Sequence, residues 1–384
     1  MSIGIKDAKI LTPSGFIHGN IEIKDGKIDM IGEGECQSCL SFPTSVYILP
    51  GFIDEHIHGA MNADSMDNSF ETLNIIAKAL AKEGTTSFLP TTMTQKMDLL
   101  KEVLSTISSY METHDQPFSE ILGVHLEGPF INKKSIGAQC EDYVIPPSIS
   151  HFKELEKAAH GKIKKVTLAP EIKGGYELIQ YLSKQGIIAS LGHSEATYDE
   201  VLEAVASGAN SITHCYNAMS PLHHRDIGLV GAALLHDNLY TELIADGVHV
   251  SDPALKLLYK NTKNTERLTL ITDSMRAKGL TDGIYDLGGQ KVHVHNQTAR
   301  LRNGVLAGGV LSMLDAVKHV IKVFDISLEE AVKLASKNPA KKLGIYDRKG
   351  SIEVGKDADL VILDTNFDLQ MTICRGKIAY EKNR

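Results

Sequence analysis

Short apolar segments alternate with helical segments eight times along the middle of this 384-residue chain. Helix-like stretches such as 69–84 and 197–208 separate the apolar ones. A strand followed by a crossover helix places the next strand parallel to it, and eight such units close a barrel. We therefore predict an α/β fold built on a (β/α)8 barrel. Its expected strands lie in 51–59, 86–92, 121–129, 165–171, 187–194, 211–218, 241–250 and 268–275.

The two ends of the chain have a different pattern. Residues 8–32 alternate apolar and polar positions with turns at 13–15 and 25–26, and residues 350–381 read similarly. Because neither end holds enough core alone, we predict one small β-sandwich domain from 1–50 and 346–384, and a barrel domain from 51–345. A helix is expected after Ser327, which forms a capping-box pattern with Glu330, and it should stop near Asn338–Pro339.

Polar side chains gather where the expected strands end. In a barrel of this kind the chemistry sits at the carboxyl ends of the strands, so residues at these positions should meet at one mouth. Seven residues satisfy this rule, and they are His56, His58, Glu127, His193, His214, His249 and Asp273.

His56 and His58 are two residues apart in a strand, so their side chains share one face. Imidazole suits a divalent metal, and Glu127, His193 and His214 add a carboxylate and two more imidazoles from three other strands. The alternative for the first pair alone is two surface histidines. The convergence of five such residues favours a metal site.

Asp273 follows the apolar run of the eighth strand. A carboxylate beside a metal-activated water can take its proton and later donate it to a leaving group. The alternative is that Asp273 caps the next helix. His125 shares the face of Glu127 and is expected to support the ligands. Asp54 should also support them, and Glu55 should face outward.

Three other motifs carry little weight. His293–His295 is a second His-x-His, but its polar surroundings indicate an exposed hairpin strand. Gly350–Lys356 mimics a phosphate loop but lacks the following Ser or Thr, and a strand rather than a helix should follow. Cys36 and Cys39 have no second pair to complete a zinc site. The chain also has no G-x-S-x-G and no H-E-x-x-H pattern, which argues against a serine hydrolase and a zincin.

Composition excludes several partner classes. The net charge of −8 and the absence of a basic stripe argue against nucleic acid. Five cysteines over this length do not indicate a disulfide framework, and the first residues lack a signal-peptide core. No apolar run is long enough to span a membrane. We expect a cytoplasmic protein.

Several quoted motifs resemble the amidohydrolase superfamily, namely PGFIDEHIHG, HLEGPF, LGHSEAT, THCYNAM, ADGVHVS, ITDSM and VGKDADLVILD. Within it, the chain is similar to the deacetylases of amino-sugar phosphates from about residue 5 to 380. Many superfamily members use a carboxylated lysine on strand 4. This chain has Ala169-Pro170-Glu171 at that strand end, and the resemblance implies that Glu127 takes the role.

The resemblance also implies the ligand contacts. Glu127, His193 and His214 would hold the main metal, and His56 with His58 makes a second ion possible. Arg225 would clamp a phosphate, and His249 would touch the substrate or polarise its acetyl carbonyl. Where many relatives have histidine, this chain has Gln139, which can donate a hydrogen bond but carries no charge. The remaining contacts would come from Ala138, Asn217, Ala218, Leu306, Ala307 and Gly308.

The expected activity is hydrolysis of the N-acetyl amide of N-acetylglucosamine 6-phosphate to glucosamine 6-phosphate and acetate, in amino-sugar catabolism. One or two divalent ions per subunit are expected, zinc or iron, with manganese or cobalt as alternatives. The resemblance further implies a homodimer in which a partner residue reaches the phosphate. Open alternatives are the N-acetylgalactosamine 6-phosphate epimer, a cyclic amidase or deaminase, and a barrel that has lost catalysis.

Overall fold

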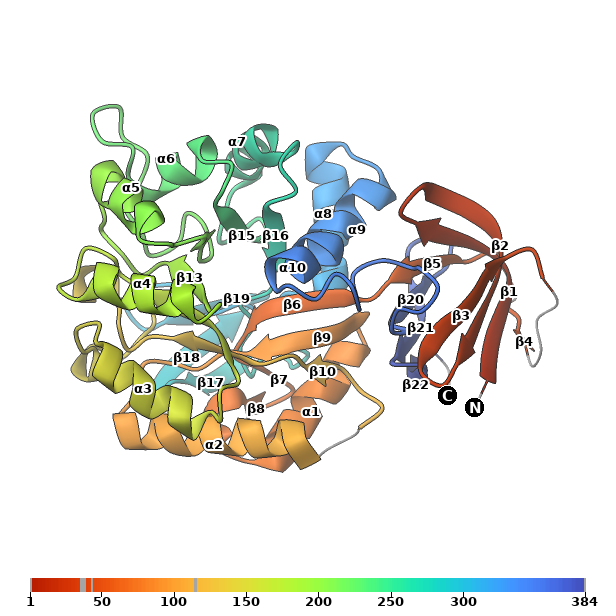
Figure 1. Ribbon diagram of the computed structural model, residues 1–384, viewed down its shortest axis with the longest axis horizontal. Helices are drawn as coiled ribbons and strands as arrows, with labels where there is room; N and C mark the ends of the chain where they lie inside the picture. The colour runs from red at the N-terminus through yellow and green to blue at the C-terminus, as the bar shows by residue number, and fades with distance from the viewer. Residues whose placement is uncertain (1, 35–38, 43, 114–115, 383–384) are drawn as a thin grey trace.

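Eight parallel strands form a closed barrel in the computed structural model, which describes residues 2–34, 39–42, 44–113 and 116–382 (Figure 1). They pair in two groups, and both seams between the groups are bridged. Thr91 pairs with His125 across one seam, and across the other the Asp273 amide donates to the His56 carbonyl at 2.9 Å. The predicted barrel is confirmed. Its strands are β6 (Phe52–Ile57), β9 (Thr85–Pro90), β11 (Val124–Glu127), β12 (Ile163–Leu168), β13 (Ile188–Leu191), β14 (Ser211–Ile212), β15 (Tyr240–Ile244) and β16 (Leu268–Ile271).

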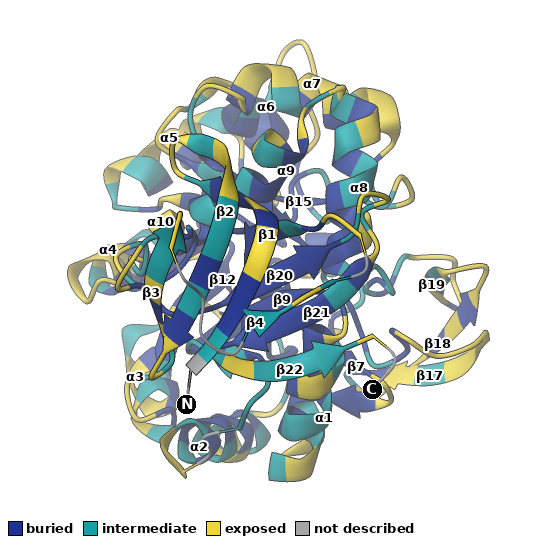
Figure 2. Ribbon diagram, turned by 90° about the vertical axis from the view of Figure 1, so that its right-hand side faces the viewer, coloured by how far each residue is buried: buried dark blue, intermediate teal, exposed yellow. Residues whose placement is uncertain are grey.

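Helices connect successive strands and cover the outside of the barrel. Their apolar faces pack on the strands in one large core, and the strands are almost wholly buried (Figure 2). Local signals start several of them, such as the capping box of Thr197 with Glu200. The helices are α1 (Phe70–Ala81), α2 (Met97–Thr113), α3 (Ile149–Ala158), α4 (Gly175–Lys184), α5 (Tyr198–Ala206), α6 (Gly228–Leu235), α7 (Asp252–Thr262), α8 (Met313–Phe324), α9 (Leu328–Ala335) and α10 (Lys337–Lys342).

The helix after Ser327 begins as predicted but ends earlier. Ser327 and Glu330 form the expected capping box of α9. The predicted stop near Asn338–Pro339 is wrong, because α9 ends at Ala335 and a separate short helix, α10, includes both residues. Pro339 lies in the first turn of α10, where a missing N–H costs no intrahelical hydrogen bond.

Strands from both ends of the chain form a second unit beside the barrel (Figure 1). They make one continuous sheet in the order β22-β21-β20-β5-β1-β2-β3, with β4 beside β1, rather than two separate sheets. Side chains such as Ile10, Ile21 and Ile362 form a core of their own, whereas Leu49 and Val361 belong to the large core of the barrel. We propose that this unit comprises 1–50 and 346–384. The strands are β1 (Ser2–Thr12), β2 (Gly15–Lys24), β3 (Lys27–Gly32), β4 (Cys39–Leu40), β5 (Tyr47–Pro50), β20 (Leu360–Leu363), β21 (Leu369–Cys374) and β22 (Lys377–Glu381).

Gly51 joins this sheet to the barrel, because β5 ends at Pro50 and β6 begins at Phe52. A Cβ atom at Gly51 would lie 2.1 Å from Oγ1 of Thr86 on the neighbouring strand, so only glycine fits. β10 (Glu120–Ile121) extends β9, and β7 (Gly59–Ala60) pairs with β8 (Ala63–Asp64).

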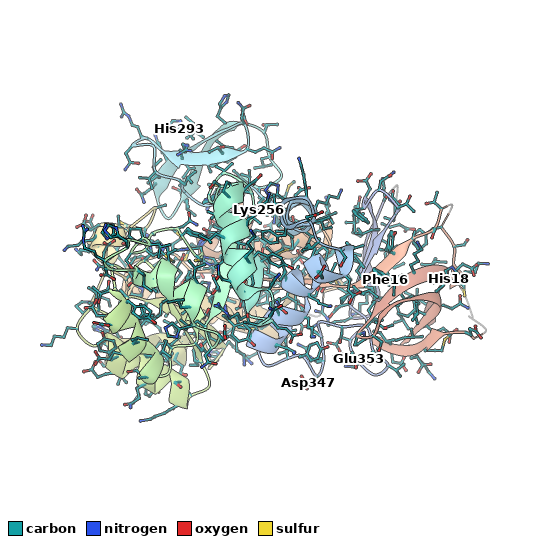
Figure 3. The ribbon with its side chains drawn as sticks, turned by 90° about the horizontal axis from the view of Figure 1, so that it is seen from above. Phe16, His18, Lys256, His293, Asp347 and Glu353 are labelled. Atoms are coloured by element: carbon teal, nitrogen blue, oxygen red, sulfur yellow. The ribbon has the colours of Figure 1, made fainter. Side chains whose placement is uncertain are left out.

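A small antiparallel sheet stands out from the barrel between β16 and α8 (Figure 3). It consists of β17 (Gly283–Leu287), β18 (Gln290–His295) and β19 (Thr298–Leu301). His293 and His295 lie on β18 and are exposed, as predicted for a hairpin strand. The segment Gly350–Lys356 is followed by strand β20 and not by a helix, which agrees with its rejection as a phosphate loop.

The cysteines are mostly unpaired. Cys140, Cys215 and Cys374 are free thiols, whereas Cys39 is disulfide-bonded, a bond that was not predicted. Cys36 lies outside the described residues, so the expectation for the Cys36–Cys39 pair stays a prediction. None of the helices in the described part of the chain has the length and apolarity needed to cross a bilayer.

Candidate metal centre and active site

Four barrel strands deliver the predicted metal ligands to one mouth. His56 lies within β6, Glu127 ends β11, and His193 and His214 follow β13 and β14. All are nearly or fully buried, which excludes the alternative of surface histidines for His56 and its neighbour His58. The backbone turns sharply at several of these strand ends, since His193, His214 and Asp273 all have positive φ angles. Such strained conformations in non-glycine residues concentrate at functional sites.

The donor atoms form two adjacent groups of three, with ligand atoms in each group lying within 4.8 Å of one another. In the first group, Glu127 Oε1 lies 3.4 Å from His193 Nε2 and 3.2 Å from His214 Nε2. The second group comprises His56, His58 and Asp273, whose Oδ1 lies 3.4 Å and 3.1 Å from the two ring Nε2 atoms. Glu127 also approaches this group, with Oε2 3.3 Å from His58 Nε2.

Hydrogen bonds on the far side of the rings orient two of the histidines. His193 Nδ1 lies 2.8 Å from the Ser135 carbonyl, and His58 Nδ1 lies 3.3 Å from the Thr91 carbonyl. A carbonyl can only accept, so Nδ1 carries a proton in both rings, and Nε2 is the nitrogen left to bind a metal ion.

The donor set fits a divalent metal ion. His56 Nε2 and Glu127 Oε1 are buried and have no hydrogen-bond partner among the described residues. Burial alone would lower the pKa of His56, but Glu127, Asp273 and Glu242 raise it to about 9. Burial also tends to raise the pKa of Glu127, yet the surrounding histidines hold it well below its usual value. The carboxylates thus stay ionised in a buried site that attracts positive charge.

Asp273 lies where the first and eighth strands meet. Burial would raise its pKa, but His56 and His58 hold the pKa below its ordinary value, so its carboxylate is ionised. It does not cap the following helix, whose N-cap is Ser312. Asp54 lies behind it, accepting from the Thr272 hydroxyl at 2.5 Å, as expected of a supporting residue.

His125 lies beneath the ligands and supports them. Its ring nitrogens lie 3.2 Å from Thr91 Oγ1 and 2.7 Å from Thr167 Oγ1, and it belongs to neither donor group. Burial and the nearby Lys165 hold its pKa well below the ordinary value. By contrast, Glu55 does not face outward. It is fully buried, and its Oε1 accepts from Thr269 Oγ1 at 2.7 Å.

A cavity of about 660 Å³ opens above the two donor groups, a size suited to a small ligand. The predicted residues that line it are His58, Glu127, Ala138, Gln139, His193, His214, Asn217, Ala218, His249, Asp273, Leu306 and Gly308.

Three predicted residues do not line this cavity. His56 lies beneath it, fully buried, and Ala307 is buried between its neighbours Leu306 and Gly308. Arg225 is exposed on the loop before α6, where its guanidinium lies 2.7 Å from His224 Nε2. Arg225 is therefore not among the residues that line the cavity of its own chain, and its contact with a phosphate stays a prediction.

Gln139 contacts the ligand set directly. Its Nε2 donates to Glu127 Oε2 at 2.9 Å, and its Oε1 accepts from the Thr94 amide at 2.6 Å. Both ends of the amide are used, so the glutamine holds one carboxylate oxygen of Glu127 in place while its side chain also lines the cavity.

His249 faces the cavity from the loop after β15. Its Nδ1 lies 2.6 Å from Oδ2 of Asp246, whose Oδ1 also accepts from the Val248 and His249 amides. Burial would lower the pKa of His249, but the bond to Asp246 and its charge raise the pKa above the ordinary value. The loop therefore presents a cationic ring to the cavity more readily than a free histidine would.

Two groups of residues were missed by the sequence prediction. Lys134 and Arg300 are cations that line the cavity, and Arg300 belongs to a segment expected to be a simple exposed hairpin. Glu242, Lys165 and Lys342 are charged side chains buried below the ligands. A single charge inside an apolar strand, such as Glu242 in TELIADG, is the signal that could have identified the second group.

Comparisons with known proteins agree with this geometry. The amidohydrolase family pattern matches residues 47–379. The N-acetylglucosamine-6-phosphate deacetylase of Bacillus subtilis (strain 168) is 45% identical over 386 residues, covering 99% of this chain and 97% of that protein. The N-acetylgalactosamine-6-phosphate deacetylase of Escherichia coli O157:H7 is 34% identical over 382 residues, covering 98% of each.

A solved structure gives the same result for the fold. The crystal structure of N-acetylglucosamine-6-phosphate deacetylase from Thermotoga maritima matches 99% of this chain and 100% of its own chain, with a TM-score of 0.89 and 38% identity. The family pattern, the full-length relatives and the strand-end ligands of the barrel all agree. The chain therefore belongs to the amidohydrolase family.

Proposed function

We propose that this chain hydrolyses the N-acetyl amide of N-acetylglucosamine 6-phosphate to glucosamine 6-phosphate and acetate, as a step of amino-sugar breakdown. The observation that carries the proposal is the pair of three-ligand groups, one of which includes Asp273, at the floor of a cavity that is also lined by cations. The Bacillus subtilis relative, 45% identical over its whole length, supports this substrate.

Glu127, His193 and His214 would hold the first divalent ion, and His56 with His58 and Asp273 would hold a second. A bound ion would supply Lewis acidity, which lowers the pKa of a water molecule and polarises the acetyl carbonyl. Nitrogen and carboxylate ligands suit zinc or iron, and also accept manganese or cobalt. One ion or two per subunit are both compatible with Glu127, because its carboxylate approaches both groups, with Oε1 near His193, His214 and His56 and Oε2 near His58.

Asp273 would move the proton. Its Oδ1 approaches His56 and His58, which leaves Oδ2 to accept a proton from the attacking water and to return it to the leaving amine. The depressed pKa of this carboxyl keeps it in the basic form that the first step needs. His249, charged more readily through Asp246, would polarise the acetyl carbonyl or contact the substrate.

Substrate binding would use the cavity wall. Asn217, Ala218 and the backbone of Leu306–Gly308 would contact the sugar and its phosphate. We propose a homodimer, because Arg225 lies outside the cavity of its own chain and its exposed loop is free to enter that of a second copy. The cytoplasmic location stays a prediction.

An acetate-release assay with defined metals tests the proposal. Replacing Asp273 with asparagine should lower kcat by about 10²–10⁴-fold while an ion at Glu127, His193 and His214 is retained. Asp347→Asn, at an exposed residue that does not line the cavity, is the control and should act like wild type (Figure 3). Near-normal turnover by Asp273→Asn would exclude it as the base.

The galactosamine epimer is the second candidate, because the Escherichia coli relative spans 98% of this chain. Values of kcat/KM for the two N-acetylated amino-sugar phosphates, measured side by side, decide between them. Efficient turnover of an unphosphorylated cyclic amide instead would contradict both.

A further inference from the structure

Four charged side chains lie buried beneath His56, in a cluster formed by Glu55, Lys165, Glu242 and Lys342. They come from β6, β12, β15 and α10, and each side chain is fully buried. Lys342 Nζ lies 3.0 Å from Glu55 Oε1 and 3.1 Å from Glu242 Oε1, and Lys165 Nζ also contacts Glu242 Oε1. Two cations thus balance two anions, without a solvent-exposed group.

The two oxygens of Glu242 have different partners. Oε1 meets both lysines, whereas Oε2 lies 3.1 Å from His56 Nδ1 and accepts from the His214 amide at 3.3 Å. Beside two buried ammonium groups, the carboxylate stays ionised and can only accept. His56 Nδ1 must therefore donate, and His56 Nε2 is the nitrogen that faces Glu127 and Asp273, where a bound metal ion would take the place of its proton.

From this geometry we infer that Glu242 is a positioning residue that fixes the tautomer and the ring orientation of His56, so that Nε2 serves as a metal ligand. The inference rests on the proposed second metal ion. Carbonyl oxygens do the same for His58 and His193, but a carboxylate partner also makes the ring a stronger donor. Loss of such a partner costs about 10–100-fold in metal affinity.

Through Lys342, the cluster links the orientation of His56 to a helix outside the barrel strands. Lys342 belongs to α10, which packs against β6 and β16. Buried ion pairs add little net stability on their own, because desolvation offsets their attraction. The two lysines keep the Glu242 carboxylate ionised, and His56 Nδ1 needs such an acceptor. This requirement explains the cluster better than a contribution to stability does.

Two double substitutions separate positioning from general stability. Glu242→Gln/Lys342→Met and Glu55→Gln/Lys342→Met each remove one lysine and one carboxylate, so the cluster keeps the same net charge. Only the first removes the carboxylate from His56. Zinc affinity and stoichiometry of the full-length chain are measured by competition with a chromophoric chelator.

We expect Glu242→Gln/Lys342→Met to bind the second zinc ion about 10–100-fold more weakly than wild type. Glu55→Gln/Lys342→Met should stay within about threefold of wild type, even if its melting temperature falls. Equal losses in both variants, or no loss in the first, would overturn the inference.

The protonation state of the His56 ring nitrogens can be read by spectroscopy without a double variant. A purely structural role of Glu242 would not determine which nitrogen carries the proton. In zinc-loaded wild-type protein labelled with ¹⁵N-histidine, His56 should show a protonated Nδ1 and a metal-bound Nε2, assigned by comparison with His56→Asn. A protonated Nε2 would overturn the inference, even if the chain proves to be a deacetylase. Conversely, the expected spectrum together with a failed acetate-release assay would contradict the proposed function and leave the role of Glu242 intact.

Discussion

Gln139 stands where the family resemblance implied a histidine, and its contacts explain what glutamine does there. Its amide bridges the Thr94 amide and Glu127 Oε2, so it restrains a ligand carboxylate and does not only line the cavity. A neutral donor can do this without adding a charge beside the histidines.

We therefore predict that Gln139→Ala weakens zinc binding about tenfold, because Glu127 loses the partner that orients it. Gln290→Ala is a matched control. Gln290 Nε2 donates to the Ala138 carbonyl at 2.6 Å, so its loss loosens the same loop without touching Glu127. Chelator competition on both variants gives the answer, and similar affinities in the two would contradict the prediction.

At the scale of elements, Asp246 in the loop after β15 has two roles: it accepts hydrogen bonds from the loop backbone, and it pairs with the His249 ring. Oδ1 of Asp246 accepts two loop amides, and Oδ2 holds the His249 ring. Asp246→Asn keeps an oxygen for the amides but removes the charge that raises the pKa of His249.

We predict that the basic limb of the pH profile of kcat/KM moves to lower pH in Asp246→Asn. The reason is that His249 then loses its proton at a lower pH than in wild type. Asp252→Asn, which removes the carboxylate from the surface pair of His319 and Asp252, should leave the profile unchanged. An unshifted basic limb in Asp246→Asn would show that His249 does not control it.

The small sheet β17–β19 is a second element that contributes to the site, because it places Arg300 on the cavity wall. If Arg300 meets the phosphate, Arg300→Met should raise KM at least about tenfold with little change in kcat. The reason is that the phosphate contact stabilises the bound substrate and the transition state equally. Arg302→Met, two residues away and outside the cavity lining, is the control.

The same measurement on Arg225→Met tests the dimer. A raised KM in a protein that light scattering shows to be a dimer would mean that Arg225 reaches the cavity of a second copy. A normal KM would leave phosphate recognition to Arg300 and Lys134 of the same chain.

At the scale of the whole molecule, Glu83 ties two distant parts of the barrel together. It follows α1, and its carboxylate lies 2.6 Å from Lys278, which follows β16. Burial raises the pKa of Glu83 to about 7, although Lys278 opposes the shift.

A carboxyl whose pKa is raised in the folded state stabilises the fold fully below its unfolded pKa. That contribution is lost as the pH rises through the folded value. We predict that Glu83 lowers the free energy of unfolding by at most about 3 kcal/mol between pH 4.5 and 7.

Urea denaturation of Glu83→Gln across this pH range should show a flatter pH dependence than wild type. Glu71→Gln, at an exposed position of α1, should keep the wild-type slope. Parallel curves for Glu83→Gln and wild type would contradict the pKa shift.

The sequence by itself determined the order of the barrel strands and the residues at their ends. Apolar runs and helical periods are local properties, so β6 to β16 and the ligand candidates from His56 to Asp273 could be read before any contact was known. Capping signals such as Ser327 with Glu330 are equally local. The end of that helix was misplaced, because α9 stops before Ser336, whose hydroxyl donates to the distant Pro50 carbonyl at 3.2 Å.

Only the tertiary structure decided which distant residues meet. Glu242 lies 186 residues from His56, and Lys342 lies 287 residues from Glu55, yet both pairs are in contact. Such meetings depend on the register of parallel strands and on barrel closure, which local patterns do not encode. For the same reason Arg225, near in sequence to His214, lies outside the cavity, while Arg300 from the small sheet lines it.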